Sequence, residues 1–278
     1  MGNRPSVLGL GPDNLQPPLC EYAVSRRKTT TSLPAPFLRR VSLLPERIAD
    51  RGAYPFNLAW LRDDFELEIT TPITIIVGEN GTGKSTLIEA IAALAGYDEA
   101  GGGKGYQPVD HSTALAASGS PLAGALRAAW LPKVTEGWFF KAESFFSVAR
   151  YLDDAAREAH AIGPDFLSWS HGEGFFRFFE ERMGRQGIYF LDEPESALSP
   201  RRQLDLLRFL HQVQVAADRQ VIIATHSPIL MTLPGARLIE VSHRGLWETE
   251  LRQTSHFQLY SDFTADPDGF LRDLLHEP

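Results

Sequence analysis

A nine-residue segment, Gly78–Thr86, has the residue types and spacing of a loop that binds phosphate groups. It fits the pattern G-x-x-x-x-G-K-[ST], in which glycines let the backbone curl until several N–H groups point at one anion. A helix that follows such a loop adds its positive N-terminal end. Lys84 would reach the β- and γ-phosphates of a nucleotide, and the Ser85 hydroxyl would ligate Mg²⁺. The candidate nucleotide-binding residues here are Gly78, Asn80, Gly81, Thr82, Gly83, Lys84, Ser85 and Thr86.

A second candidate site is the acidic pair Asp192-Glu193, which directly follows the apolar run 188–191. Such a run predicts a buried strand, so both carboxylates would lie at the C-terminal edge of a sheet, where α/β proteins bind ligands. There Asp192 would hold Mg²⁺ and Glu193 would act as general base on the attacking water. A strand ending in a solvated acidic turn would show the same residues, but the phosphate loop favours the catalytic interpretation.

His226 follows another buried run, 221–225, and would lie at the same edge of the sheet. An isolated histidine is more often structural than catalytic. At this edge, however, an imidazole can reach a γ-phosphate and orient both the attacking water and Glu193. The candidate catalytic residues are therefore Lys84, Glu193 and His226.

The segment Trp169–Glu173 has two compatible interpretations. Ser170 and Glu173 form the pattern S-x-x-E, a capping box that opens a helix over about 175–182. A serine-capped helix start with a nearby glycine, Gly172, is also an anion site, and it could bind the γ-phosphate held by another subunit.

The surrounding patterns predict the elements that position these residues. Alternating apolar and polar residues predict half-buried antiparallel strands, and continuous apolar runs predict strands buried on both faces. The alternating segments are 37–44 and 65–69, the apolar runs are 73–77, 188–191 and 221–225, and closing strands are expected at 237–241 and 246–251.

Helical spacing predicts a helix over 84–94 that stops at Gly96. A second helix is expected to begin at Ser199 as its cap, with Pro200 in its first position. Its apolar stripe would consist of Leu204, Leu207 and Leu210, and one or two helices are expected within 256–278.

Three regions are less regular. Residues 1–35 are rich in Pro, Gly, Ser and Thr and predict a flexible N-terminal arm before a single domain over 36–278. Residues 97–136 predict a loop-rich insertion with one short helix near 120–130, and a long helix is expected over about 143–160. Within the single domain, the range 97–185 would form an insertion or helical subdomain.

The composition limits the class of protein. The chain has 278 residues, 43% of them hydrophobic, and a net charge of −8. This excess of acid argues against a protein held to DNA mainly by its overall charge. A single cysteine, Cys20, excludes a disulfide framework within the chain. No apolar run has the length of a membrane span or of a signal-peptide core, so a cytoplasmic location is expected.

Taken in order, these four segments resemble the motifs of the ATP-binding-cassette (ABC) ATPases: the phosphate loop (Walker A), the signature-like 169–173, the acidic pair (Walker B) and the switch-like His226. The resemblance implies an α/β fold of the P-loop NTPase type. It would have a mostly parallel central sheet, an antiparallel β subdomain and a helical subdomain carrying the signature motif. It also implies Mg²⁺-dependent ATP hydrolysis in a head-to-tail homodimer, in which each ATP lies between the phosphate loop of one chain and Ser170/Gly172 of the other. An aromatic residue before the loop would stack on adenine, with Tyr54 and Phe56 as candidates.

The sequence departs from the family pattern at three motifs. The signature reads WSHGE where transporters usually have LSGGQ, and its closing Glu resembles that of the SMC-like ATPases. The usual Gln of the Q-loop has no clear counterpart, and Glu143 is its stand-in. The D-loop ends in Ser199 instead of Asp. The resemblance is therefore to small stand-alone bacterial ATPases that share the SMC-like head without its coiled-coil arms.

These features leave several functions open. The leading hypothesis is a soluble hydrolase whose ATP-dependent dimerisation controls an unidentified protein partner. The alternatives are a nucleotide-binding subunit of an ABC transporter and an ATP sensor with little turnover. Binding to nucleic acid is possible but has no support in the net charge of −8.

Overall fold

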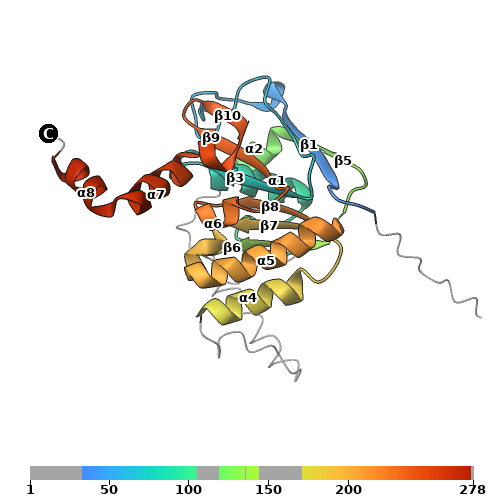
Figure 1. The fold of residues 1–278 in the computed structure, drawn as a ribbon. Coiled ribbons are helices and arrows are strands. Elements are labelled where there is room, and N and C mark those ends of the chain that lie inside the picture. The colour runs from blue at the N-terminus through green and yellow to red at the C-terminus, as the bar shows by residue number, and fades with distance from the viewer. Residues whose placement is uncertain (1–32, 105–118, 135, 144–170, 277–278) are drawn as a thin grey trace, which may run out of the picture. The chain divides into compact units, whose positions relative to one another are not determined.

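A seven-stranded sheet forms the centre of the protein (Figure 1). The computed structural model describes residues 33–104, 119–134, 136–143 and 171–276, all within one unit that spans Ser32–Pro278. The strand order is β10-β9-β3-β8-β7-β6-β4, in which β9, β3, β8, β7 and β6 run parallel and the two outer strands run antiparallel to their neighbours. The bounds are β3 Ile73–Val77, β4 Gly102–Gly103, β6 Gly137–Lys141, β7 Ile188–Asp192, β8 Gln220–Ala224, β9 Arg237–Ser242 and β10 Gly245–Thr249.

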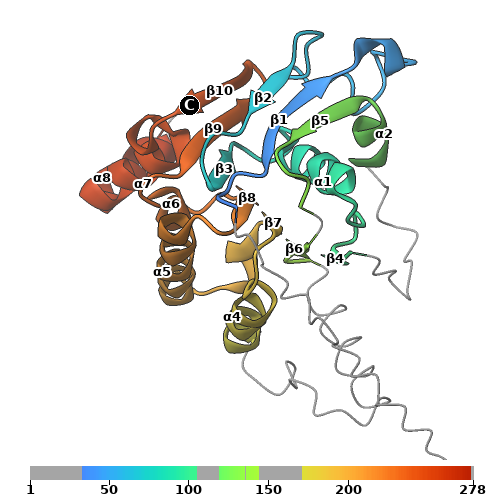
Figure 2. The ribbon, with the colours of Figure 1, turned by 90° about the vertical axis from the view of Figure 1, so that its right-hand side faces the viewer.

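The apolar runs form the central strands because helices cover both faces of the sheet (Figure 2). All five residues of β3 are buried: Ile76 packs into the cluster on one face, and Ile75 and Val77 pack into the cluster on the other. Helices α1 (Lys84–Ala95) and α2 (Gly119–Gly124) cover the first face. Helices α4 (His171–Arg182), α5 (Pro200–Ala216) and α6 (Pro228–Met231) cover the second. The strands expected at 73–77, 188–191 and 221–225 are confirmed.

A second, antiparallel sheet has the order β2-β1-β5, and it confirms the two alternating strands. Its strands are β1 Leu38–Leu43, β2 Glu66–Glu68 and β5 Leu126–Trp130. The helix expected near 120–130 is wrong in its second half, because α2 ends at Gly124 and the chain continues as β5. Buried and more exposed side chains alternate along β5, and its backbone hydrogen-bonds to β1. Strand β6 was not expected from the sequence either.

Two of the helix predictions are confirmed at their ends. Helix α1 ends at Ala95, before Gly96. Helix α5 begins after Ser199, whose Oγ accepts a hydrogen bond from Arg202 N at 3.4 Å. The predicted stripe of α5 is wrong at Leu204, which is 43% exposed. Its fully buried positions are Leu206, Leu210 and Val213, which follow the 3.6-residue period on the side of the helix opposite Leu204.

Two predictions from the sequence lie largely outside the described residues. They are the N-terminal arm up to residue 32 and the helix over 143–160. Ala35, at the end of the predicted arm, is buried, and its N–H donates to Ala217 O at 2.8 Å.

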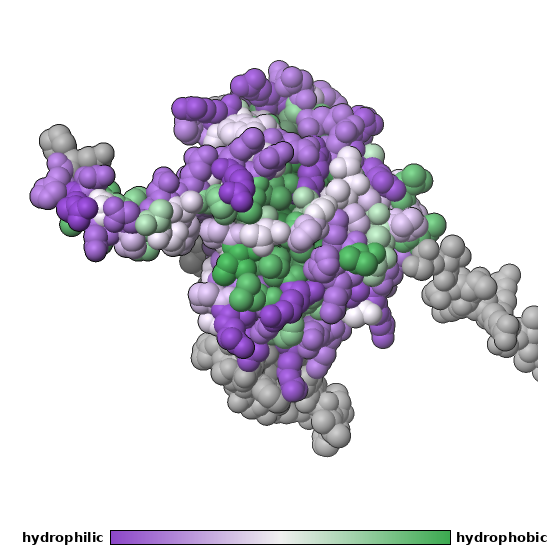
Figure 3. All heavy atoms as spheres, viewed as in Figure 1, coloured by the Kyte–Doolittle hydropathy of each residue, from purple (hydrophilic) through white to green (hydrophobic). Residues whose placement is uncertain are grey.

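The last two helices, α7 (Ser255–Ala265) and α8 (Pro267–His276), follow the short helix η3 (Leu251–Gln253) and lead away from the central sheet (Figure 1). Thr254 and His256 are buried, whereas the residues from Gln258 to Asp268 are exposed. On the face of the molecule that Figure 1 shows, apolar side chains gather over α6 and the neighbouring part of α5 (Figure 3). None of the helices in the described ranges is long and apolar enough to cross a membrane.

Candidate nucleotide and metal site

The loop 78–83 connects the end of β3 to the start of α1, and two of its glycines are required by the geometry. Gly83 caps α1 with φ +92°, and a Cβ there would lie 2.9 Å from Leu58 Cδ1. Gly78 has φ +149°, and a Cβ there would lie 2.1 Å from the carbonyl oxygen of Val241 on β9. A side chain at either position would therefore combine backbone strain with a steric clash.

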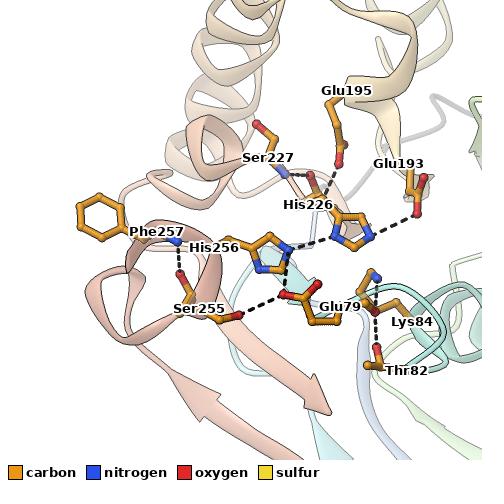
Figure 4. Close-up of polar contacts among 12 residues, drawn as sticks. Glu79, Thr82, Lys84, Glu193, Glu195, His226, Ser227, Ser255, His256 and Phe257 are labelled. Carbon is orange, nitrogen blue, oxygen red and sulfur yellow. Dashed lines mark hydrogen bonds and ion pairs between the residues drawn. The ribbon is translucent and has the colours of Figure 1, made fainter. Parts of the chain in front are cut away.

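Lys84 lies in the first turn of α1 and points back over the loop (Figure 4). Its Nζ donates to the carbonyl oxygen of Glu79 at 3.0 Å, and Thr82 Oγ1 donates to the same oxygen at 2.8 Å. Burial lowers the pKa of Lys84, although the nearby carboxylates of Glu193 and Asp192 act in the opposite direction. The loop thus holds a buried ammonium group against one of its own backbone carbonyls, at the position where a phosphate-binding loop places its lysine.

Trp60, in the segment between β1 and β2, supports the phosphate loop. Its Nε1 donates to the carbonyl oxygen of Thr82 at 2.8 Å, and the side chain is 3% exposed. Pattern analysis did not identify Trp60 because its contact joins residues that are 22 positions apart.

Ser85 and Asp192, the two expected metal ligands, lie together. Ser85 Oγ donates to Asp192 Oδ1 at 3.1 Å, across 107 residues of sequence. Burial raises the pKa of Asp192 to about 7, and the charge of Lys141 acts against that rise. A hydroxyl beside a buried carboxylate that favours an added positive charge is the oxygen-rich donor set that Mg²⁺ prefers. The residues present therefore fit a magnesium ion.

Glu193 and His226 face each other at the ends of β7 and β8 (Figure 4). Glu193 Oε1 lies 3.5 Å from His226 Nε2, and Glu193 keeps 39% of its side chain exposed. Glu193 has φ +48°, a left-handed conformation that is uncommon for a residue with a side chain. Burial lowers the pKa of His226, with Lys84 acting in the same direction, so the ring is neutral at pH 7.

The backbone of His226 is held by a residue that sequence reasoning missed. His226 N donates to Glu195 Oε1 at 2.5 Å, and Glu195 lies in the short helix η2 (Pro194–Ala197) just after the acidic pair. Burial raises the pKa of Glu195. This hydrogen bond connects the residue that follows β8 to the short helix that follows β7. The only signal for it in the sequence is the third carboxylate of the run Asp-Glu-Pro-Glu at 192–195.

A cavity of about 420 Å³ opens beside the Ser85–Asp192 pair. Its walls include Glu143, which the sequence predicts as the stand-in for the Q-loop residue, together with Ser85, Glu89, Ala142, Asp192, Glu193, Ser196 and Ala197. Lys141 Nζ lies 2.7 Å from Glu89 Oε1 and 2.9 Å from Glu143 Oε1. Burial opposes the charge of Lys141, but Glu89 and Glu143 outweigh that effect and raise its pKa. Glu89 of the cavity wall thus belongs to a buried ion pair with Lys141, which the sequence motifs did not predict.

The remaining predicted residues are placed as follows. Tyr54 is 54% exposed, and its hydroxyl hydrogen-bonds to Thr86 Oγ1 in the first turn of α1. Phe56 packs against the core cluster on the α1 face of the sheet. Of the signature segment, Ser170 lies outside the described residues, and Gly172 falls in the first turn of α4. Asn80 and Gly81 are exposed at the tip of the phosphate loop.

Two family models match separate parts of the chain. One is described as "AAA domain" and matches residues 56–122. The other is described as "AAA domain, putative AbiEii toxin, Type IV TA system" and matches residues 175–232. The first range contains the phosphate loop, and the second contains Asp192, Glu193 and His226. The strand order and the phosphate loop describe an α/β fold of the P-loop type, and the two matches show that separate parts of the chain resemble AAA domains.

Similar solved structures include three proteins described as ABC transporters or their parts. One is an inward-facing "putative metal-chelate type ABC transporter", with 16% identity, coverage of 81% of this chain and 88% of that chain, and a TM-score of 0.48. MJ1267, an ATP-binding cassette of an ABC transporter, has 13% identity, coverages of 81% and 99%, and a TM-score of 0.46. The cbiO1 protein from Clostridium perfringens, part of the ABC transporter complex cbiONQ, has 15% identity, coverages of 86% and 100%, and a TM-score of 0.45. No curated protein sequence matches this chain.

Proposed function

We propose that this chain binds and hydrolyses Mg-ATP, and that ATP holds two copies in a head-to-tail dimer that controls a protein partner. The observation that carries the proposal is the meeting of three segments at the carboxyl edge of the sheet. Ser85 Oγ lies 3.1 Å from Asp192 Oδ1, and Glu193 Oε1 lies 3.5 Å from His226 Nε2. Strands β3, β8 and β7 are parallel neighbours, so the residues that follow them converge there.

Each side chain has a distinct task in this proposal. Lys84 and the N–H groups of the loop hold the β- and γ-phosphates. Ser85 and Asp192 hold Mg²⁺, which when bound neutralises charge on the phosphate oxygens. Glu193 accepts a proton from the attacking water, and its exposed carboxylate leaves room for that water. Neutral His226, which faces Glu193, orients the water and the γ-phosphate.

The dimer is proposed because, among the described residues, the phosphate loop and the proposed general base are exposed on one side of the site. Glu79 and Asn80 in the loop are exposed, and Glu193 is only partly covered. A second copy could close this side with Ser170 and Gly172 of the signature-like segment, of which Gly172 lies in the first turn of α4. The same residues would serve a nucleotide-binding subunit of a transporter, in which a membrane protein would be the partner.

The test is the solution mass, measured by light scattering, of wild type and Glu193→Gln with and without Mg-ATP. We expect Glu193→Gln to become a stable dimer only with Mg-ATP, whereas wild type hydrolyses ATP and returns to monomer. Glu46→Gln, an exposed glutamate in the helix η1 (Pro45–Arg47), is the matched control and should behave as wild type. Two monomeric proteins with ATP bound would refute the homodimer, and dimers without measurable turnover would favour the ATP sensor.

A further inference from the structure

A second histidine connects the first turn of α7 to the proposed catalytic site (Figure 4). His256 Nε2 lies 3.0 Å from His226 Nδ1, and the two ring centroids are 5.2 Å apart. The same nitrogen lies 3.9 Å from Glu79 Oε1 of the phosphate loop, and Ser255 Oγ donates to that carboxylate oxygen at 3.4 Å. The start of α7 therefore contacts both the proposed γ-phosphate histidine and the phosphate loop.

This contact is a built feature of the fold. His256 is 9% exposed and Thr254, the cap of α7, is fully buried, whereas α7 is exposed from Gln258 onward. Only the first turn of α7 is thus anchored. Burial lowers the pKa of His256, as it does that of His226, so two neutral rings meet at pH 7.

Two neutral imidazole rings whose nitrogens lie 3.0 Å apart share one proton between those nitrogens. The ring that carries this proton decides whether His226 Nε2 is a hydrogen-bond donor or an acceptor. If His226 Nδ1 carried the proton, its Nε2 would be a lone pair facing the Glu193 carboxylate at 3.5 Å, and the two would repel. If His256 Nε2 carries the proton, it donates to His226 Nδ1, and His226 Nε2–H then faces Glu193. The Glu79 carboxylate near His256 Nε2 also favours a proton on that atom.

We propose that His256 is a positioning residue, which donates its Nε2–H to His226 Nδ1 and so holds His226 as an Nε2–H donor toward Glu193 and the γ-phosphate. This inference rests on the proposed function, because it assigns His256 to the orientation of a residue in the proposed ATP site. The same hydrogen bond between His256 and His226 both anchors the first turn of α7 and orients His226. A change at the proposed nucleotide site would therefore reach the C-terminal helices through this bond.

The first test reads the proton directly. The ¹⁵N chemical shifts of the imidazole nitrogens, measured at pH 7 on wild-type protein, should show His226 as the Nε2–H tautomer. In His256→Leu, which removes the donor, we expect a mixture of tautomers. Finding His226 as the Nδ1–H tautomer in wild type would overturn the proposal, and this measurement needs no turnover of ATP.

The second test is steady-state ATP hydrolysis by variants at position 256. Loss of an outer hydrogen bond that orients a catalytic histidine is expected to lower kcat by about 10–100-fold, by analogy with outer-shell partners of metal-bound histidines. His256→Leu should show this loss with KM within about threefold of wild type. His256→Gln can still donate from its amide and should keep kcat within about threefold. His211→Leu, at an exposed histidine of α5, is the matched control.

Each outcome of this second test bears on one hypothesis. Equal losses in His256→Leu and His256→Gln would mean that His256 only fills space, and unchanged kcat in His256→Leu would also overturn the proposal. His256→Asn has an amide too short to reach His226 and provides the donor-free case if the leucine variant does not fold. If wild type hydrolyses no ATP, or if Glu193→Gln turns over as wild type does, the proposed function fails. The tautomer measurement then still decides the role of His256.

Discussion

Replacing Lys84 with methionine separates binding of nucleotide from stability of the fold. Methionine keeps the length of the side chain but removes its charge. The Lys84 side chain is 4% exposed, and burial lowers its pKa in spite of the surrounding carboxylates. The native environment therefore disfavours the charged form relative to water. We expect Lys84→Met to be at least as stable as wild type in the absence of nucleotide.

The effect on binding follows from Coulomb's law. An ammonium group about 4 Å from one phosphate charge gains about 4 kcal/mol at an effective dielectric constant of about 20. Because each 1.4 kcal/mol corresponds to about a factor of ten in an equilibrium constant, the variant should bind ATP about 10³-fold more weakly. The hydrogen bond from Lys84 Nζ to the Glu79 carbonyl at 3.0 Å holds the ammonium over the loop before any phosphate arrives.

Thermal unfolding measures both effects in one assay. ATP at about 100 times its Kd should stabilise the wild type by about 2.7 kcal/mol. At about 2–4 °C per kcal/mol for a domain of this size, its Tm should rise by roughly 5–10 °C. At the same ATP concentration, Lys84→Met should show no rise, while the control Lys133→Met, at an exposed lysine, should shift as wild type does.

Two results would refute this reasoning. A wild-type shift in Lys84→Met would show that the loop does not hold the phosphates through this lysine. A variant that is clearly less stable than wild type without ATP would show that the carboxylates around Lys84 outweigh the cost of burying its charge.

Three further predictions concern turnover, stability and pH. Glu193→Gln should lower kcat by about 10²–10⁴-fold and leave the ATP affinity within a few-fold of wild type. Single-turnover hydrolysis and equilibrium binding measure the two effects. A smaller loss of kcat would show that Glu193 is not the general base. Glu89→Gln should cost about 3 kcal/mol in urea unfolding, because it breaks a 2.7 Å pair with Lys141 in which both side chains are under 10% exposed. A cost below about 1 kcal/mol would show that water reaches the pair. Since the pKa values of His226 and His256 are lowered from 6.5, the unfolded chain binds more protons at these two residues just below that pH, and this contribution lowers stability as pH drops through 6.5. The raised pKa of Asp192 acts in the opposite direction in wild type and variant alike, so the slope of stability against pH should be less positive in His256→Gln than in wild type. An equal slope in the variant would contradict this.

Local pattern was sufficient for the elements that carry the site. Strands β3, β7 and β8 are short β-branched or apolar runs whose side chains are buried on both faces, so their composition alone marks them. The phosphate loop and the start of α1 follow from glycine, lysine and hydroxyl residues at fixed spacing. The cap of α5 follows from Ser199 and Pro200 in the same way, because capping depends only on neighbouring residues.

Other elements depend on partners that are distant in sequence. Strand β5 occupies the second half of the helix predicted near 120–130, because pairing with β1 satisfies its backbone in an extended conformation. The apolar stripe of α5 was misplaced at Leu204 for a related reason. Which leucines are buried depends on the side of the helix that packs against the sheet, and a leucine-rich helix leaves more than one choice.

The sequence by itself determined the chemistry of the proposed site, because phosphate, metal and proton-transfer groups must be of particular types, and short motifs specify those types. The tertiary structure alone decided which groups support them. The contacts of Glu195 with His226, of Glu89 with Lys141 and of His256 with His226 join residues 31, 52 and 30 positions apart. No periodicity or motif encodes such distances, since they depend on how parallel strands and the first turn of α7 bring separate segments to one edge of the sheet.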